Sequence, residues 1–270
     1  MSSPQNPWSD PGLLPAPEQP APLTAIPSED PVWSGWDVLQ IVLLTLASVL
    51  VFLSLVGVAA QRLLYPKTPI VEVMLYPLVA VLGQALAYLL ILGFMVLIVK
   101  RNPIQDFQQA IRWNWPYNWP TYLVAGIALS FALQGIAHFL PIPKELPMDR
   151  FFRTPGEAWA LSLFGVTFAP LLEELFFRGF LYPVLARRLG IAIAVLTTAA
   201  AFSLIHAPQL GRAWGPVLVI FMVGLALTIT RAVTRSVAAS WIMHMAYNGT
   251  LSILLFAGTD GFRHLERLNQ

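Results

Sequence analysis

Two adjacent carboxylates and one guanidinium stand inside an apolar stretch of the sequence. Glu173, Glu174 and Arg178 fall within the run 159–185, where nearly every other side chain is apolar. A charge at the centre of a bilayer costs on the order of 2.5–3.5 kcal/mol on insertion scales. On a helix Glu174 and Arg178 share a face and can pair, whereas Glu173 points about 100° away. The spacing predicts a structural ion pair and a free Glu173, although all three could form one buried structural cluster.

Two later segments supply polar partners within the apolar part of the chain. His206 ends one apolar stretch, and Ser240, His244 and Asn248 recur every four residues along another. A lone histidine near a helix end is often an interfacial cap, and a polar stripe can simply hydrogen-bond to a neighbouring helix. Polar groups on three separate helices nevertheless favour one shared cavity.

These residue types match a hydrolytic site without a covalent nucleophile. A buried glutamate can act as a general base, and a histidine can share the proton transfer or bind a metal. A second histidine and an asparagine amide can donate to an oxyanion. The chain has no cysteine, which excludes disulfides and thiolate nucleophiles, and the zinc-protease spacing H-E-x-x-H is absent. The set therefore indicates attack of an activated water on a peptide carbonyl.

The composition places these residues in a membrane protein. Of the 270 residues, 57% are hydrophobic and 11% are charged, against about 25% charged in a soluble domain. The net charge of +2 is too small to indicate a nucleic-acid partner. We expect an integral, multi-pass protein of a bacterial-type cell membrane or an internal membrane.

Seven apolar stretches are long enough to be helices of a membrane bundle. They are 36–60, 73–99, 119–140, 157–186, 191–206, 214–231 and 236–256. Pro77 lies near the start of the second and Pro170 inside the fourth, so each can bend its helix. The sequence predicts an all-α, polytopic fold with about 7–8 transmembrane helices.

The three polar segments together resemble the CPBP family of intramembrane proteases. This family includes type II CAAX prenyl endopeptidases, bacteriocin-processing enzymes and abortive-infection-like proteins, and its pattern is E-E-x-x-x-R, F-x-x-x-H and H-x-x-x-N. Residues 173–178, 202–206 and 244–248 match the three motifs in order. The resemblance covers about 160–260, and residues 1–150 add only a compatible number of helices.

The resemblance implies a catalytic cavity within the helix bundle and a role for each matched residue. Glu173 and His206 would activate water, and His244 with Asn248 would stabilise the oxyanion. Structural support would come from three further residues, Glu174, Arg178 and Phe202.

The resemblance leaves the cofactor open. Family members have been described as metalloproteases and also as glutamate-dependent enzymes without an obligatory metal. Glu173, His206 and His244 could bind Zn²⁺ or another divalent metal with an open position for water. The preferred interpretation is water activation without a tightly held metal, and no cofactor is assigned.

The sequence is expected to divide into four parts. Residues 1–34 hold nine prolines and no Lys or Arg, which predicts a disordered tail. N-terminal transmembrane helices follow over 35–150, catalytic helices over 151–260 and a short polar tail over 261–270.

The expected function is that of an intramembrane endopeptidase. Its substrate would be a membrane-associated peptide or protein, prenylated or bacteriocin-like, and its surroundings the lipid bilayer. A non-catalytic membrane scaffold or immunity protein is one alternative. A proton-coupled transporter is the other, although no internal repeat supports it.

Overall fold

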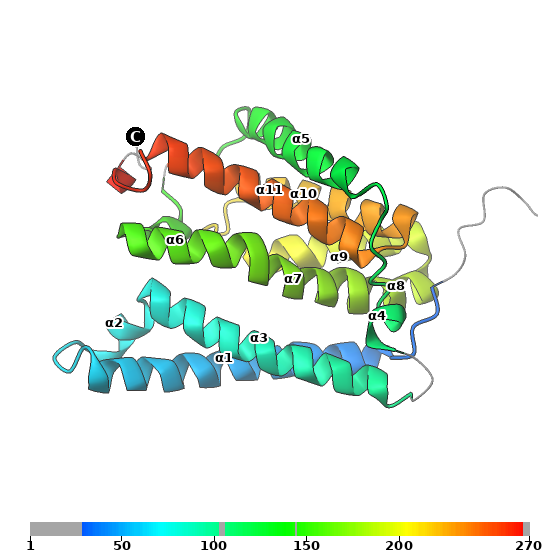
Figure 1. The fold of residues 1–270 in the computed structure, drawn as a ribbon, viewed down its shortest axis with the longest axis horizontal. Helices are drawn as coiled ribbons and strands as arrows, with labels where there is room; N and C mark the ends of the chain where they lie inside the picture. Colours follow the sequence, from blue (N-terminus) through cyan, green and yellow to red (C-terminus); the bar gives the residue numbers. More distant parts are fainter. Residues whose placement is uncertain (1–28, 103–105, 144, 267–270) are drawn as a thin grey trace, which may run out of the picture.

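The computed structural model describes residues 29–102, 106–143 and 145–266, and every regular element in these ranges is helical. In Figure 1 the helices α1–α3 form one side of the molecule, and a long helix containing α6, α7 and α8 runs beside them. The helices α5, α9, α10 and α11 complete the other side. The predicted all-α fold is confirmed for the described residues.

The first layer is an antiparallel pair of long helices. Helix α1 (Gly35–Leu63) begins at a capping box, in which Ser34 and Asp37 satisfy each other's backbone N–H groups. Helix α2 (Ile70–Met74) is a single short turn, and α3 (Pro77–Lys100) begins at Pro77. The sequence predicted one helix from residue 73, but the chain breaks between α2 and α3. A proline is tolerated at the first helical position and disfavours helical geometry in the residue before it, which explains the break.

The central helix is continuous but contains two π-helical segments. It consists of α6 (Pro155–Leu163), the π-helix η2 (Phe164–Phe168), α7 (Ala169–Glu174), the π-helix η3 (Leu175–Leu181) and α8 (Tyr182–Leu189). Each π segment is followed by a helix with a proline, Pro170 or Pro183, at its second residue. Because proline lacks a donor and its ring clashes with the carbonyl four residues earlier, a local change in hydrogen bonding is expected there.

The remaining long helices pack closely through small residues. They are α5 (Trp119–Ala137), α9 (Ile191–His206), α10 (Trp214–Thr234) and α11 (Val237–Gly258), with the short α4 (Phe107–Ala110) and the 3₁₀ turn η1 (Pro147–Phe151) in the connections. A Cβ on Gly126 of α5 would lie 2.3 Å from the Met243 carbonyl oxygen of α11. That glycine lets the two backbones touch, as small residues do in membrane bundles.

The chain is an integral, multi-pass membrane protein. Within the described residues, α1, α3, α5, the helix 155–189 and α10 are long and apolar enough to cross a membrane, and α9 is a shorter apolar helix. Helix α11 has 22 residues but carries the polar row Ser240, His244 and Asn248. Large apolar side chains such as Leu50 and Leu97 are more than half exposed, as expected of a surface that faces lipid.

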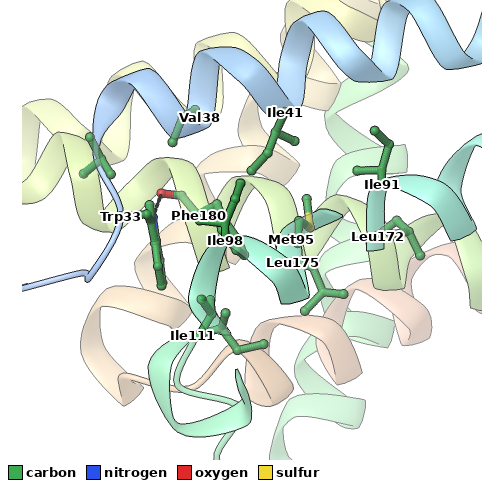
Figure 2. Close-up of a cluster of buried hydrophobic side chains, with 12 residues drawn as sticks. Trp33, Val38, Ile41, Ile91, Met95, Ile98, Ile111, Leu172, Leu175 and Phe180 are labelled. Atoms are coloured by element: carbon green, nitrogen blue, oxygen red, sulfur yellow. Dashed lines mark hydrogen bonds between the residues drawn. The ribbon is translucent and has the colours of Figure 1, made fainter. Parts of the chain in front are cut away.

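The residues just before α1 pack against residues of later helices and connections. Of the predicted N-terminal tail, residues 1–28 lie outside the described part. Glu29 is buried and its carboxylate pairs with Arg112 and Arg231. The Trp33 indole donates to the Phe180 carbonyl oxygen at 3.0 Å and stacks on its ring (Figure 2). The stretch 29–34 therefore joins α1 to η3 and α10.

Candidate active site

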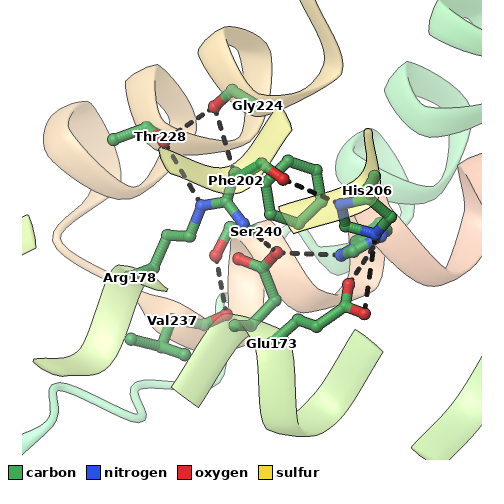
Figure 3. A network of polar contacts seen from close by, with 10 residues as sticks. Glu173, Arg178, Phe202, His206, Gly224, Thr228, Val237 and Ser240 are labelled. Carbon is green, nitrogen blue, oxygen red and sulfur yellow. Dashed lines mark hydrogen bonds and ion pairs between the residues drawn. The ribbon is translucent and has the colours of Figure 1, made fainter. Parts of the chain in front are cut away.

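Glu173 faces two histidines from two other helices. Its carboxylate oxygens lie 3.9 Å from Nε2 of His206 on α9 and 3.8 Å from Nε2 of His244 on α11 (Figure 3). Glu173 and His206 are slightly exposed, whereas His244 is buried. The structure thus brings together three residues separated by up to 71 positions.

The hydrogen-bond partners fix the orientation of both imidazole rings. Nδ1 of His206 lies 2.8 Å from the Phe202 carbonyl oxygen, and Nδ1 of His244 lies 2.9 Å from the Glu174 carboxylate. Both partners can only accept, so each Nδ1 carries a proton and donates it. Each ring consequently turns its Nε2 towards Glu173.

The ion pair that the spacing predicted is present. Arg178 donates through Nη1 to Glu174 Oε1 at 2.8 Å, and both side chains are completely buried. The other donors of the guanidinium reach the Gly224 carbonyl oxygen at 3.1 Å and the Thr228 hydroxyl at 3.3 Å on α10. A buried charge pair is tolerated when such extra hydrogen bonds complete it. Glu174 also accepts a hydrogen bond from His244. The ion pair, which is hydrogen-bonded to α10 through Arg178, therefore helps to fix the orientation of that imidazole.

Phe202 packs among the charged and aromatic groups of the site. Its ring lies 4.6 Å from the Arg178 guanidinium carbon and 4.8 Å from the centre of the His206 ring. A cation over an aromatic face is attracted by the ring quadrupole. Phe202 therefore restricts the movement of both the Arg178 guanidinium and the His206 ring.

Asn248 and Ser240 occupy different places along α11. The Asn248 amide donates to the Gly165 carbonyl oxygen in η2 at 2.7 Å and lines the same cavity as Glu173. The Ser240 hydroxyl donates to the Val237 carbonyl oxygen of its own helix. Of the polar row on α11, His244 lies 3.8 Å from the Glu173 carboxylate, and Asn248 leaves one amide hydrogen for another partner.

The polar groups open into a cavity of about 490 Å³. Its walls come from α3, η1, α6, η2, α7, α9, α10 and α11, and they include Glu173, His206, His244 and Asn248. This volume lies within the range of about 300–1,000 Å³ that is usual for ligand pockets. Glu173 also borders a narrower apolar cavity of about 160 Å³ between α1, α3 and α9.

Two residues of α3 at this site were missed by the sequence reasoning. Gln84 lines the large cavity, and its side-chain amide donates at 2.7 Å to the hydroxyl of Tyr88, which lines the narrow one. Glu173 lines both cavities. The sequence did contain an indication of these residues, because two polar side chains four positions apart interrupt a helix that is otherwise apolar on all sides.

Glu173, His206 and His244 are residue types that bind divalent metals. Their side chains lie farther apart than the ligands of a bound metal do. Two imidazole nitrogens and a carboxylate are ordinary zinc ligands. Zinc–ligand distances of about 2.0–2.1 Å in a tetrahedron require neighbouring donors about 3.3–3.4 Å apart. The two separations from Glu173 are 3.8 and 3.9 Å, and no cluster of three or more acidic, histidine or cysteine residues within metal-binding spacing occurs in the described part of the chain. A small movement of the side chains would be needed to close this set around an ion.

Comparison with known proteins identifies the segment that holds this site. Residues 155–250 match the family model described as type II CAAX prenyl endopeptidase, Rce1-like. The matched segment includes Glu173, Glu174, Arg178, Phe202, His206, His244 and Asn248. No curated protein and no solved structure matches the chain. The resemblance to the CPBP family is confirmed.

Proposed function

Since residues 155–250 match the model of this protease family, we propose that the protein is an intramembrane endopeptidase in which Glu173 and His206 activate a water molecule. The observation that carries this proposal is the convergence of Glu173, His206 and His244 on one cavity inside a membrane-spanning bundle. Gaps of 3.8–3.9 Å are too long for direct hydrogen bonds. One water molecule between the Glu173 carboxylate and the histidines can bridge them by hydrogen bonds and be held in position for the reaction.

The first chemical step uses the two hydrogen-bond acceptors that face the water. Because the Phe202 carbonyl fixes the proton of His206 on Nδ1, its Nε2 can accept from the water. The Glu173 carboxylate accepts the second hydrogen and removes it as the water oxygen attacks the peptide carbon. The developing oxyanion is stabilised by the free amide hydrogen of Asn248 and by protonated His244.

The second step breaks the peptide bond. Glu173 returns its proton to the nitrogen of the leaving amine, the C–N bond breaks, and the products are a carboxylic acid and an amine. Glu174 stabilises the charged form of His244 through Nδ1, as a carboxylate beside an imidazole does in other hydrolases. A divalent metal, when bound, would be held by Glu173, His206 and His244 and would polarise the water and the carbonyl.

The surroundings of Glu173 support a membrane-associated substrate. The narrow cavity that Glu173 borders is lined by Leu46, Ile91, Met95 and Phe176 among other apolar groups. Leu46 is largely exposed on the lipid-facing surface of α1. An apolar group of the substrate can be accommodated there, which supports a prenylated or bacteriocin-like peptide as the finer assignment.

The test is cleavage of a membrane-anchored fluorogenic peptide by the protein reconstituted in liposomes. We expect Glu173→Gln to lower the rate by about 10²–10⁴-fold, because the general base is lost. Glu72→Gln removes an exposed carboxylate on α2 and should leave the rate unchanged. Full activity of Glu173→Gln would overturn the mechanism, and pH-driven flux without proteolysis would favour the transporter.

The metal is tested on the same preparation. Under the proposed metal-free mechanism, purified active protein contains far less than one divalent metal per chain, and a chelator leaves the rate unchanged. One tightly held zinc per chain, together with loss of activity on its removal and recovery on its return, would assign Glu173, His206 and His244 as ligands instead.

A further inference from the structure

A second group of charged side chains lies away from the candidate active site, at the end of the bundle where α4 and α8 lie (Figure 1). It consists of Arg112, which follows α4, of Arg231 and Arg235 at the end of α10, and of Glu29, which precedes α1. None of these residues lines either cavity. In this arginine cluster, three guanidinium groups share one carboxylate.

Backbone contacts hold two of these arginines next to each other. The backbone N–H of Val237 donates to the Arg112 carbonyl oxygen at 3.0 Å, and the Asn114 side-chain amide donates to the Arg235 carbonyl oxygen at 3.3 Å. Arg112 and Arg235 both have a left-handed backbone, with φ of 60° and 55°, which is uncommon for a residue other than glycine. The connection before α5 is therefore bound to the turn between α10 and α11, and both arginines project from this junction.

Glu29 satisfies only part of the donors in the cluster. Its carboxylate accepts from Nη1 and Nη2 of Arg231 at 3.0 and 3.4 Å and pairs with Nε of Arg112 at 3.1 Å. Nε of Arg231, a residue that is only 1% exposed, is buried without a hydrogen-bond partner. Nε of Arg235 is also buried and unpartnered, and its guanidinium forms no ion pair within the described part of the chain. A buried donor without an acceptor is costly, so the cluster favours a further acceptor.

The guanidinium groups of the cluster are close enough to repel one another. Burial lowers the pKa of Arg112, the carboxylate of Glu29 raises it, and the positive charges of Arg235 and Arg231 lower it again. The side chain of Arg112 is 21% exposed, and Arg235 is also partly exposed. An anion that approaches from outside the protein can therefore reach both groups and relieve the repulsion.

Exposed tryptophans indicate that this end of the bundle lies at the membrane–water boundary. Trp36 stands in the first turn of α1, Trp119 is the first residue of α5, and Trp115 lies in the connection before it. All three are exposed. Tryptophan is enriched at the level of the lipid headgroups, where phosphate is the abundant anion. A guanidinium binds phosphate through two parallel N–H donors, and basic pockets between membrane helices bind anionic headgroups.

We infer that Arg112 and Arg235 form a binding site for the phosphate group of an anionic phospholipid, with the buried Arg231 adding positive charge behind them. The phosphate oxygens accept from the guanidinium of Arg235 and from the remaining Nη groups of Arg112. Glu29 neutralises one of the three positive charges, so the site prefers a headgroup with a net negative charge. A free phosphate ion has the same chemistry, and the position among exposed tryptophans favours the lipid.

The experiment is native mass spectrometry of the full-length protein in detergent, which counts the bound molecules. The probes are phosphatidylglycerol, the zwitterionic phosphatidylcholine and inorganic phosphate. We expect phosphatidylglycerol to bind more tightly than the other two. Arg235→Gln should weaken its binding by about tenfold or more, because charge-assisted hydrogen bonds are lost. The matched control is Arg153→Gln, which removes an exposed arginine just before α6, at the opposite end of the central helix, and should bind the lipid as the wild type does.

Two further measurements separate binding from folding. The Arg235 guanidinium has no ion-pair partner to lose among the described residues, so Arg235→Gln should melt at the temperature of the wild type. Arg235→Lys keeps the charge without the planar pair of donors and should bind the lipid with intermediate affinity.

The possible results distinguish the site from its occupant. Equal binding of phosphatidylglycerol by the wild type and by Arg235→Gln would overturn the site. Equal affinity for phosphatidylcholine would overturn the preference for a net negative headgroup. Inorganic phosphate that displaces the lipid, and that Arg235→Gln binds equally poorly, would support the phosphate site and overturn the lipid as its occupant.

Discussion

Replacing Glu174 by Gln should destabilise the protein far more than the same change at Glu173. Glu174 and Arg178 are completely buried, and the other acceptors of the guanidinium are uncharged. The Glu174→Gln variant keeps the shape of the side chain but leaves a buried charge without its counter-charge. Breaking one partner of a buried pair costs about 3–5 kcal/mol. At about 2–4 °C per kcal/mol for a chain of this size, the melting temperature should fall by about 6–20 °C.

The matched control is Glu173→Gln, which has the same chemical change one residue away. Its carboxylate makes contacts of 3.8–3.9 Å and is partly exposed, so we expect a loss within about 1 kcal/mol. The assay is thermal unfolding of both purified variants in detergent, followed by tryptophan fluorescence. The chain has nine tryptophans and no cysteine for a thiol-reactive dye. Equal melting temperatures of the two variants would refute the division into a structural and a catalytic glutamate.

Three further variants probe other parts of the structure. Asn248→Ala should lower kcat about 10²–10³-fold in the peptide assay, because an oxyanion donor is lost, and should reduce stability by only about 1 kcal/mol. Glu29→Gln should destabilise the protein by about 3–5 kcal/mol in the fluorescence melt, because the nearly buried guanidinium of Arg231 loses its carboxylate. Gly126→Leu should reduce the yield of folded protein in size-exclusion chromatography, since a side chain there would overlap the Met243 carbonyl; an unchanged elution profile would contradict the close packing of α5 on α11.

Local spacing was sufficient to predict the parts of the site that lie on one helix. The pairing of Glu174 with Arg178 follows from their separation of four residues, and the structure contains it. The convergence of Glu173 with His206 and His244 depends on how three helices pack, which no local pattern determines. The family resemblance predicted that these three residues form one site, and the structure gives the distances between their side chains.

The features that sequence reasoning missed depend on contacts between distant segments. The π segments η2 and η3 surround α7, and only the prolines that follow them gave a local indication. Gln84 and Tyr88 gain their position from the packing of α3 beside α6 and η2, where the Tyr88 ring contacts Phe164 and Phe168. Trp33 lies in a proline-rich stretch, yet it is buried because Phe180, 147 residues later, offers a carbonyl and a ring.

The central claim is that Glu173 and His206 act as a unit on one water molecule. A double-mutant cycle on kcat/KM for peptide cleavage tests it most directly, with Glu173→Gln, His206→Ala and the double variant. Residues that act together are strongly non-additive, so the double variant should be no slower than the slower single variant. Losses that multiply in the double variant would show two independent contributions and would contradict the account.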